Sequence, residues 1–239
     1  ELRRCRVELR QDRVTEVAVS GGRVSGVKLE KAGLVNCEAV LLATGGASYP
    51  RTGSTGDGYR IAEALGHTIT PIRGSLVPLE SEDRACSQLQ GLSLRNVVLR
   101  MKNQRGKTVY QEQGELLFTH FGLSGPLVLS ASAHMDFARD RYAAHIDLKP
   151  ALDEEKLDAR LLRDFGERAN QDVSNALGAL VPRSMIPVMA ERTGIDGQTK
   201  VRDIRREQRR RLLDALKDFT VDISGPRPVE EAIVTAGGV

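Results

Sequence analysis

The chain has 239 residues, of which 40% are hydrophobic and 28% are charged, and its formal net charge is +3 at pH 7. This length and composition predict a globular protein with one large domain or two small ones, since there is enough apolar surface for a buried core. Aromatic residues make up only 4% and Trp is absent, so the core is expected to be aliphatic. The positive charge is too small to argue for nucleic-acid binding by itself.

Three cysteines, Cys5, Cys37 and Cys86, are far apart and odd in number. Without a CxxC pair they exclude a zinc knuckle and a disulfide framework, and they favour a reducing, cytoplasmic setting. The apolar runs are too short to span a bilayer, and "ELRRCRVELR" is too charged for a signal peptide. Because the chain starts with Glu and ends at "TAGGV", we expect a piece of a larger protein.

The first third of the chain reads as strands followed by a helix. "VTEVAV" and "RVSGVKL" flank "SGG" and predict a hairpin. "LVNCEAVLLA" predicts a third strand, whose apolar run Ala39–Ala43 is expected to be more deeply buried. After a loop rich in Gly, Ser and Thr, helical spacing predicts a helix over Asp57–Leu65 that ends before Gly66.

From residue 69 to 148 the pattern changes to short strands: "TITPI", "SLVPLE", "NVVLRMK", "KTVYQE", "GELLFT" and "AAHIDL". Their number and spacing predict a small antiparallel barrel or sandwich. After Pro150 helical spacing begins with "DEEKLDARLLRDFGER" and continues over four helices, of which the third opens at Pro182 and the last runs from about Asp203 to Lys217. "FTVDISGP" and "EEAIVTAGGV" then predict returning strands, so the order suggests an insertion into a doubly wound domain.

The glycine-rich loop, "ATGGASYPRTGSTGDGY", matches none of three well-defined loop chemistries. It lacks the Lys of a P-loop and the GxGxxG order of a dinucleotide fingerprint, and "GLSGP" further on is not a GxSxG elbow. Glycines after a strand let the main chain approach a flat or anionic ligand, and the helix start at Gly56–Gly58 favours an anion. An ordinary turn in which Asp57 caps the helix fits the spacing equally well.

Three segments carry a resemblance to a known family: "ATGGASYPRTGSTGDGY", "GELLFTHFGLSGP" and "EEAIVTAGGV". They resemble the signature segments of the HI0933-like (BaiN-like) flavoproteins, in the family's order and across nearly the whole chain. The resemblance implies a Rossmann-like FAD domain interrupted by an antiparallel β-barrel, which itself carries a small all-helical subdomain. The implied boundaries are a partial FAD-binding domain at 1–72, barrel at 73–150, helical subdomain at 151–216, a barrel return strand at 217–229 and a return to the FAD-binding domain at 230–239.

The same resemblance implies which residues bind FAD. The first meander strand is expected to contact the adenine through its backbone, the glycine loop to line or flank the FAD site, and the final strand to return towards the flavin. The family's first dinucleotide turn would precede Glu1 and its closing segment would follow Val239, which leaves open whether this chain binds FAD alone. The implied residues are Val14, Thr44, Gly45, Gly46, Thr55, Gly56, Asp57, Gly58, Gly237 and Gly238.

His120 is the candidate catalytic residue. It lies beside a glycine turn in "FTHFGLSGP", where an imidazole can act as a proton donor, although a structural hydrogen-bonding role is the more frequent one. Ser124 has no evident base nearby, so a nucleophile is not expected. His67, His134 and His145 have no metal-ligand spacing, so no metal site is expected.

"KVRDIRREQRRR", Lys200–Arg211, is the strongest charge run, with seven basic residues. One interpretation is a surface for RNA or an acidic partner. The other, which we favour because no aromatic residues are interleaved, is a solvated helix face with pairs such as Asp203–Arg206 and Glu207–Arg211.

These observations lead to two hypotheses of function. In the first, the parent protein is an FAD-dependent oxidoreductase that transfers hydride to a conjugated small-molecule or nucleobase substrate, and the present fragment is inactive alone. The family resemblance admits substrates from steroid-like enones to a uracil of ribosomal RNA. In the second, the chain is a substrate- or RNA-recognition insert without activity of its own.

Overall fold

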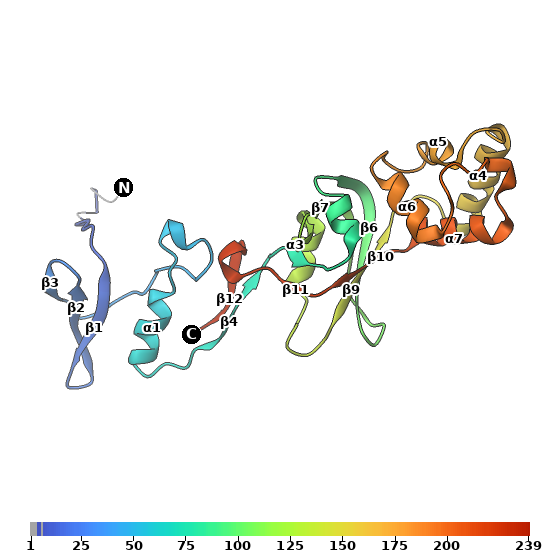
Figure 1. Cartoon of the computed structure of the whole chain (residues 1–239). Helices are drawn as coiled ribbons and strands as arrows, with labels where there is room; N and C mark the ends of the chain where they lie inside the picture. The colour runs from blue at the N-terminus through green and yellow to red at the C-terminus, as the bar shows by residue number, and fades with distance from the viewer. Residues whose placement is uncertain (1–3, 6) are drawn as a thin grey trace. The chain divides into compact units, whose positions relative to one another are not determined.

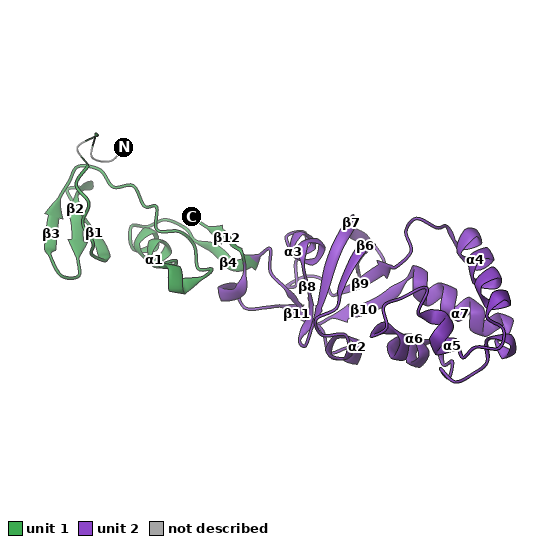
Figure 2. Cartoon of the chain, turned by 90° about the horizontal axis from the view of Figure 1, so that it is seen from above, with its two compact units in different colours: residues 1–74, 233–239 green, residues 75–232 purple. Residues whose placement is uncertain are grey.

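The computed structural model describes residues 4–5 and 7–239. The chain divides into two compact units, which Figures 1 and 2 show. Unit 1 contains the residues up to Gly74 together with Ile233–Val239, and unit 2 is Ser75–Ala232. Unit 2 is therefore an insertion between the two chain segments that make up unit 1.

Unit 1 begins with an antiparallel three-stranded meander of β1 (Val14–Ser20), β2 (Arg23–Leu29) and β3 (Gly33–Asn36). The predicted hairpin is confirmed. Gly21 and Gly22 form its turn with φ values of 57° and 76°, a left-handed conformation that glycine adopts without strain.

The prediction of a buried strand over Ala39–Ala43 is wrong. The third strand ends at Asn36, residues 37–46 have no regular structure, and Leu41 is 90% exposed. A strand forms only when a neighbour satisfies its backbone N–H and C=O groups, and no described strand pairs with this run. An apolar composition alone therefore did not make it a strand.

The rest of unit 1 consists of a short 3-10 turn, η1 (Pro50–Thr52), the predicted helix α1 (Asp57–Ala64), and a two-stranded sheet. That sheet pairs β4 (Thr70–Ser75) with β12 (Val234–Gly238), and so joins the two chain segments of the unit.

Unit 2 is built on one seven-stranded sheet of order β10-β9-β6-β7-β8-β5-β11. Its centre is the long hairpin of β6 and β7, and one face carries the main hydrophobic core, in which Leu99, Met101 and Phe118 are fully buried. The strands are β5 (Leu79–Glu80), β6 (Ser93–Asn103), β7 (Thr108–Thr119), β8 (Gly122–Ser124), β9 (Tyr142–Asp147), β10 (Phe219–Ile223) and β11 (Gly225–Pro226).

The predicted closed barrel is not observed among the described strands. β10 pairs only with β9, and β11 pairs with β5, so the sheet has two edges. These edge strands are nevertheless successive parts of one stretch that is interrupted at Ser224, whose N–H donates to Glu80 O at 2.9 Å. The stretch thus pairs first with β9 and then with β5, and β10 and β11 stand at the two ends of the strand order.

Helices α4 to α7 gather beyond one end of the sheet, as Figure 1 shows, and form the expected helical module. Their apolar faces share the core of the sheet, with Leu157, Leu161 and Leu212 fully buried. Two helices that pack beside the strands, α2 and α3, were not predicted. The helices of unit 2 are α2 (Arg84–Gln88), α3 (Pro126–Ser132), α4 (Glu154–Glu167), α5 (Val173–Leu177), α6 (Met185–Thr193) and α7 (Arg206–Lys217), with 3-10 turns η2 (Val201–Asp203) and η3 (Val229–Glu231).

Candidate functional site

The glycine loop of unit 1 is closed on itself at its base. Gly56 N–H donates to Gly46 O at 3.1 Å, which ties the start of α1 to the residues that follow the irregular apolar run. Gly45, Gly53 and Gly56 have φ values of 76°, 99° and 78°. Side chains rarely adopt this left-handed conformation, so the path of the loop requires glycine at these positions.

Thr235 of β12 holds the loop from the other end of the chain. Its Oγ1 accepts hydrogen bonds from the N–H groups of Ala47 at 2.9 Å and Ser48 at 3.1 Å. A Cβ on Gly46 would lie 2.3 Å from this Oγ1, so the absence of a side chain at Gly46 is what allows Thr235 to reach the loop. Sequence reasoning missed Thr235, although it stands two residues before the predicted Gly237.

Tyr59, which follows the "GDG" of the loop, lies against three of the predicted segments. A Cβ on Gly56 would lie 3.6 Å from its ring, one on Gly238 would lie 3.2 Å away, and one on Gly46 would lie 3.3 Å from its hydroxyl. Tyr59 and Thr235 thus bring together Thr44–Gly46, Gly56–Gly58 and the end of β12. Tyr59 was also missed, since nothing in its local pattern indicates such contacts.

The two glycines at the end of β12 serve the pairing with β4. Gly237 has φ of 89°, and a Cβ there would collide with Pro71 O at 2.2 Å. Gly238 donates its N–H to Thr70 Oγ1 at 2.9 Å, and its carbonyl oxygen accepts from the same hydroxyl at 2.9 Å. The collision at Pro71 O gives Gly237 a structural reason to be glycine, and a φ of 129° gives one to Gly238.

Several backbone donors of the loop are left without a protein acceptor. No described residue accepts a hydrogen bond from the N–H groups of Thr44, Gly45 and Gly46, or from those of Asp57 and Gly58 at the start of α1. The helix has no side-chain cap at Gly56, so the predicted capping role of Asp57 is not observed. Thr55 is exposed, and its N–H donates to Gly53 O at 3.0 Å. Free amides beside a helix N-terminus suit an anionic or carbonyl-bearing ligand.

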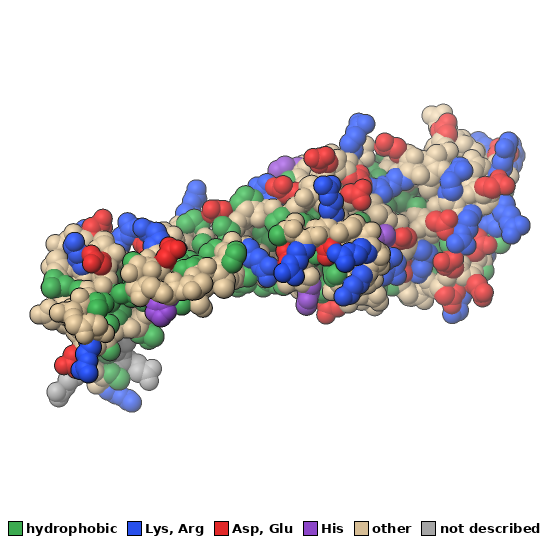
Figure 3. All heavy atoms as spheres, turned by 90° about the horizontal axis from the view of Figure 1, so that it is seen from below, with side chains coloured by type: hydrophobic (Ala, Val, Ile, Leu, Met, Phe, Trp, Pro, Cys, Tyr) green, Lys and Arg blue, Asp and Glu red, His purple; other side chains and the backbone are tan. Residues whose placement is uncertain are grey.

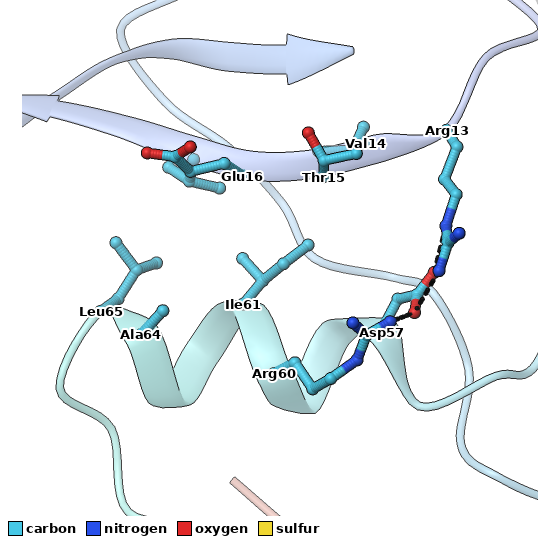
Figure 4. Close-up of a pocket in the computed structure, with 10 residues that line it drawn as sticks. Arg13, Val14, Thr15, Glu16, Asp57, Arg60, Ile61, Ala64 and Leu65 are labelled. Carbon is cyan, nitrogen blue, oxygen red and sulfur yellow. Dashed lines mark hydrogen bonds and ion pairs between the residues drawn. The ribbon is translucent and has the colours of Figure 1, made fainter. Parts of the chain in front are cut away.

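Val14 and Asp57, both predicted cofactor contacts, line one pocket of about 340 Å³ between β1 and α1. In Figure 4, Ile61 and Ala64 of α1, and Leu65 directly after it, lie across this space from β1. The pocket is apolar on its helix side and polar at one end. Its complete lining is Arg13, Val14, Thr15, Glu16, Val17, Asp57, Arg60, Ile61, Ala64 and Leu65.

Asp57 forms the polar end of this pocket. Arg13 donates from Nε to Oδ2 at 2.9 Å and from Nη2 to Oδ1 at 3.0 Å, and Arg60 also contacts Oδ1 (Figure 4). The carboxylate is only 16% exposed. Two guanidiniums against one carboxylate leave this end with a net positive charge, which bidentate pairing holds in place.

His120 lies in unit 2, in the turn between β7 and β8, and is exposed. Its ring stands edge-on to Phe121 with centroids 5.1 Å apart, and Arg227 lies over the Phe121 ring at 4.7 Å. Arg227 is held by Glu80 at 2.8 Å and by Glu231 at 3.0 Å, and its bonds to Glu231 lower the pKa of that carboxyl group. His120 therefore sits on an ordered platform with its imidazole accessible to solvent.

The basic run Lys200–Arg211 is largely engaged by the protein itself. Arg209 pairs with Asp158 at 2.8 Å and Arg210 with Glu154 at 2.9 Å, both on α4, while Arg211 donates to Thr193 O. The two pairs expected from sequence are not the ones formed. On the face that Figure 3 shows, acidic and basic side chains alternate over the helical module.

In the described part of the chain, no group of three His, Cys, Asp or Glu side chains is placed to hold a metal ion. Among the described helices, none is both long and apolar enough to cross a bilayer.

Comparison with known proteins identifies the family of this chain. The family model for the HI0933-like protein barrel and H2TH domain matches residues 73–234. The chain belongs to the HI0933-like family. The match extends over all of unit 2, and the resemblance predicted from the signature segments is confirmed.

Individual relatives extend over both units. The chain is 32% identical over 220 residues to a ribosomal RNA dihydrouridine synthase of Escherichia coli, covering 90% of this chain and 52% of that protein. It is 30% identical over 205 residues to the enzyme of the same name from Haemophilus influenzae, covering 85% and 48%. It is 24% identical over 244 residues to a 3-dehydro-bile acid delta(4,6)-reductase of Clostridium scindens, covering 98% and 59%. The chain thus spans about half the length of the curated relatives it matches.

Proposed function

We propose that the protein containing this chain is an FAD-dependent reductase, and that it saturates a conjugated double bond in a uracil base of ribosomal RNA. Uracil is favoured over a steroid-like enone because the two RNA-modifying relatives are 32% and 30% identical, against 24% for the bile-acid reductase. Both kinds of relative are named for reductive chemistry, so the reaction class is common to the two alternatives.

The observation that carries the cofactor proposal is the set of free backbone amides in the glycine loop. The N–H groups of Thr44, Gly45 and Gly46 and those at the start of α1 have no described acceptor. Such donors fit the phosphates or the ring carbonyls of FAD. When bound, FAD would accept and deliver hydride, which no side chain can do.

The chain's own residues would then bind and orient. Gly45 and Gly46 would donate hydrogen bonds from a loop that Thr235 keeps in shape, and Val14 would offer its backbone to the adenine. Arg13 and Arg60 already neutralise Asp57, so its carboxylate would not repel a phosphate near α1. His120 would hold the proton that a carbon receives when the double bond is reduced.

We also propose that residues 1–72 and 230–239 belong to the FAD-binding domain, and that 73–229 are an insert with its helical part at 151–216. This division agrees in outline with the limits of unit 2 and of the family match. The family match begins after Gly58 and ends before Gly237, so it leaves out the residues expected to bind FAD. A recognition insert without activity of its own is therefore the second candidate function.

The test is an FAD titration of the chain and of the complete protein, followed by visible absorbance. We expect the complete protein to bind FAD and, once its flavin is photoreduced anaerobically, to convert uridine in ribosomal RNA to dihydrouridine, detected by mass spectrometry. His120→Gln should slow conversion and remove one ionisation from its pH profile without weakening FAD binding. A complete protein that binds no flavin would contradict the proposal, and the recognition insert would then be the remaining candidate function.

A further inference from the structure

The helical module has an open cleft along α4 that the family resemblance did not indicate. It has a volume of about 690 Å³, and four of its side chains are cationic against a single carboxylate. We refer to it as the basic cleft. Its lining residues are Leu152, Lys156, Ala159, Arg160, Arg163, Asp164, Arg168 and Ala179.

The carboxylate in the basic cleft does not neutralise it. Asp164 is 15% exposed and is shared by two guanidiniums, Arg160 Nε at 3.3 Å and Arg163 Nη2 at 3.2 Å. Arg168 donates only to a backbone carbonyl, that of Ala176 at 3.4 Å. One negative charge therefore faces three guanidiniums, which leaves donors and net charge for an anion.

Two lysines lie near the start of α4. Lys156 is paired with Asp153 outside the lining, at 2.6 Å, and both side chains are more than half exposed. The pKa of Lys149, which precedes α4, is lowered by burial and by the charge of Arg160. Burial is the larger cause, and the positive charge of Arg160 adds to it.

The run Lys200–Arg211, the other basic candidate, differs in this respect. Lys200, Arg202, Arg209 and Arg210 each lie within 4.0 Å of a different carboxylate, whereas Arg160 and Arg163 of the cleft share Asp164. Within the described residues only Arg205 and Arg206 of the run have side chains in no ion pair or hydrogen bond. Two of these pairs, those of Arg209 and Arg210, connect α7 to α4.

We propose that the basic cleft binds the phosphate backbone of the RNA substrate. The proposal rests on the proposed function in that it takes RNA as the substrate. Planar guanidiniums bind phosphate oxygens in pairs, and an open cleft lined by several of them follows a chain of phosphates. No aromatic side chain lines the cleft, so it would contact the backbone and carry no base recognition.

The test measures RNA binding by the complete protein carrying paired charge-removing variants. A fluorescein-labelled RNA stem–loop is titrated at several salt concentrations and followed by fluorescence anisotropy. Arg160→Gln with Arg163→Gln removes two charges from the cleft, and Arg205→Gln with Arg206→Gln removes two from the run. A second cleft pair, Lys156→Gln with Arg168→Gln, serves if the first fails to fold, which circular dichroism reports.

We expect the cleft variants to lower the slope of log K against log salt by about 1.4 to 1.8, at 0.7 to 0.9 per lost phosphate contact. Near 0.1 M salt this corresponds to a loss of affinity of about 25-fold or more. The variant of the run should retain the wild-type slope. Equal losses in both pairs, or a loss only in the run, would overturn the proposal.

Two further outcomes separate this inference from the proposed function. Wild-type protein that reduces a small enone but binds no RNA would overturn the inference and leave the flavin reductase standing. Protein that binds RNA through the cleft but neither binds flavin nor forms dihydrouridine would support the inference and contradict the proposed reductase function. Competition by polyglutamate as strong as competition by unlabelled RNA at equal charge would assign the cleft to an acidic protein and overturn the proposal.

Discussion

Gly46→Ala should release the glycine loop from β12. The new Cβ would lie 2.3 Å from Thr235 Oγ1 and 2.7 Å from Thr235 Cβ, where ordinary contact begins near 3.4 Å. Thr235 would have to move by about an ångström, and its bonds to the N–H groups of Ala47 and Ser48 would be lost. Two such bonds contribute about 0.5 to 1.5 kcal/mol each, and overpacking costs about 1 to 3 kcal/mol. We expect a local destabilisation of about 2 to 6 kcal/mol.

Hydrogen exchange followed by mass spectrometry measures this effect directly, because the Ala47 and Ser48 amides are the donors to Thr235. A loss of about 2 kcal/mol speeds their exchange by about 30-fold. Gly53→Ala is the matched control, since its Cβ would meet nothing within 4 Å and only the left-handed φ of 99° adds about 1 to 2 kcal/mol. Unchanged exchange in Gly46→Ala, or a larger effect in the control, would refute this reasoning.

Three further predictions concern single side chains. Gly58→Ala should change the melting temperature little. Its Cβ would meet only the end of the Thr44 side chain, and alanine favours the helix over glycine by about 1 kcal/mol. A loss of unfolding free energy above about 2 kcal/mol would contradict this. Arg227→Gln should make the free energy of unfolding depend less on pH in acid. In the wild type the pKa of Glu231 is lower in the folded than in the unfolded protein, so Glu231 contributes stability above its unfolded pKa. That stability is lost as the pH falls through the folded pKa. The effect should stay below about 1 kcal/mol because Glu231 is 42% exposed, and urea unfolding at several pH values measures it. Burial raises the pKa of Cys86 to about 11, so iodoacetamide at pH 8 should label the exposed Cys5 well before Cys86, and equal rates would count against the buried thiol.

Elements whose signals are local could be predicted from the sequence. The β1–β2 hairpin follows from β-branched residues around a glycine turn, and α1 follows from spacing within eight residues. Gly114 shows where local signals mislead: "KTVYQE" and "GELLFT" were expected as two short strands, but one strand, β7, runs through both, with Gly114 inside it. A Cβ there would be 3.1 Å from the Leu127 side chain of α3, so the glycine makes room for a helix that was itself not predicted.

Features that depend on residues far apart in the chain could not be predicted. Thr235 contacts residues 188 and 187 positions away, and Arg209 pairs with a carboxylate 51 positions away. The expected pairs within the run Lys200–Arg211 did not form, because Arg211 donates instead to Thr193 O, 18 positions away, and Asp203 lies 4.0 Å from Arg202. The prediction of a strand over Ala39–Ala43 was wrong for a related reason. The composition of this run suits a strand but does not show whether a neighbouring strand is present to pair with it.

Two different roles could therefore require a glycine at Gly46, and a flavin titration alone would not distinguish them. The space that a Cβ on Gly46 would occupy is taken by Thr235, while the free amide of Gly46 is the group proposed to meet FAD. Gly46→Ala would weaken flavin binding under either role. Adding Thr235→Gly removes both clashing atoms but not the amide, so recovery of FAD affinity in the double variant would show that the loss came from packing. If the double variant binds FAD no better than Gly46→Ala while Thr235→Gly alone binds it as the wild type does, the Cβ itself obstructs the cofactor, and the glycine is required on the ligand side of the loop.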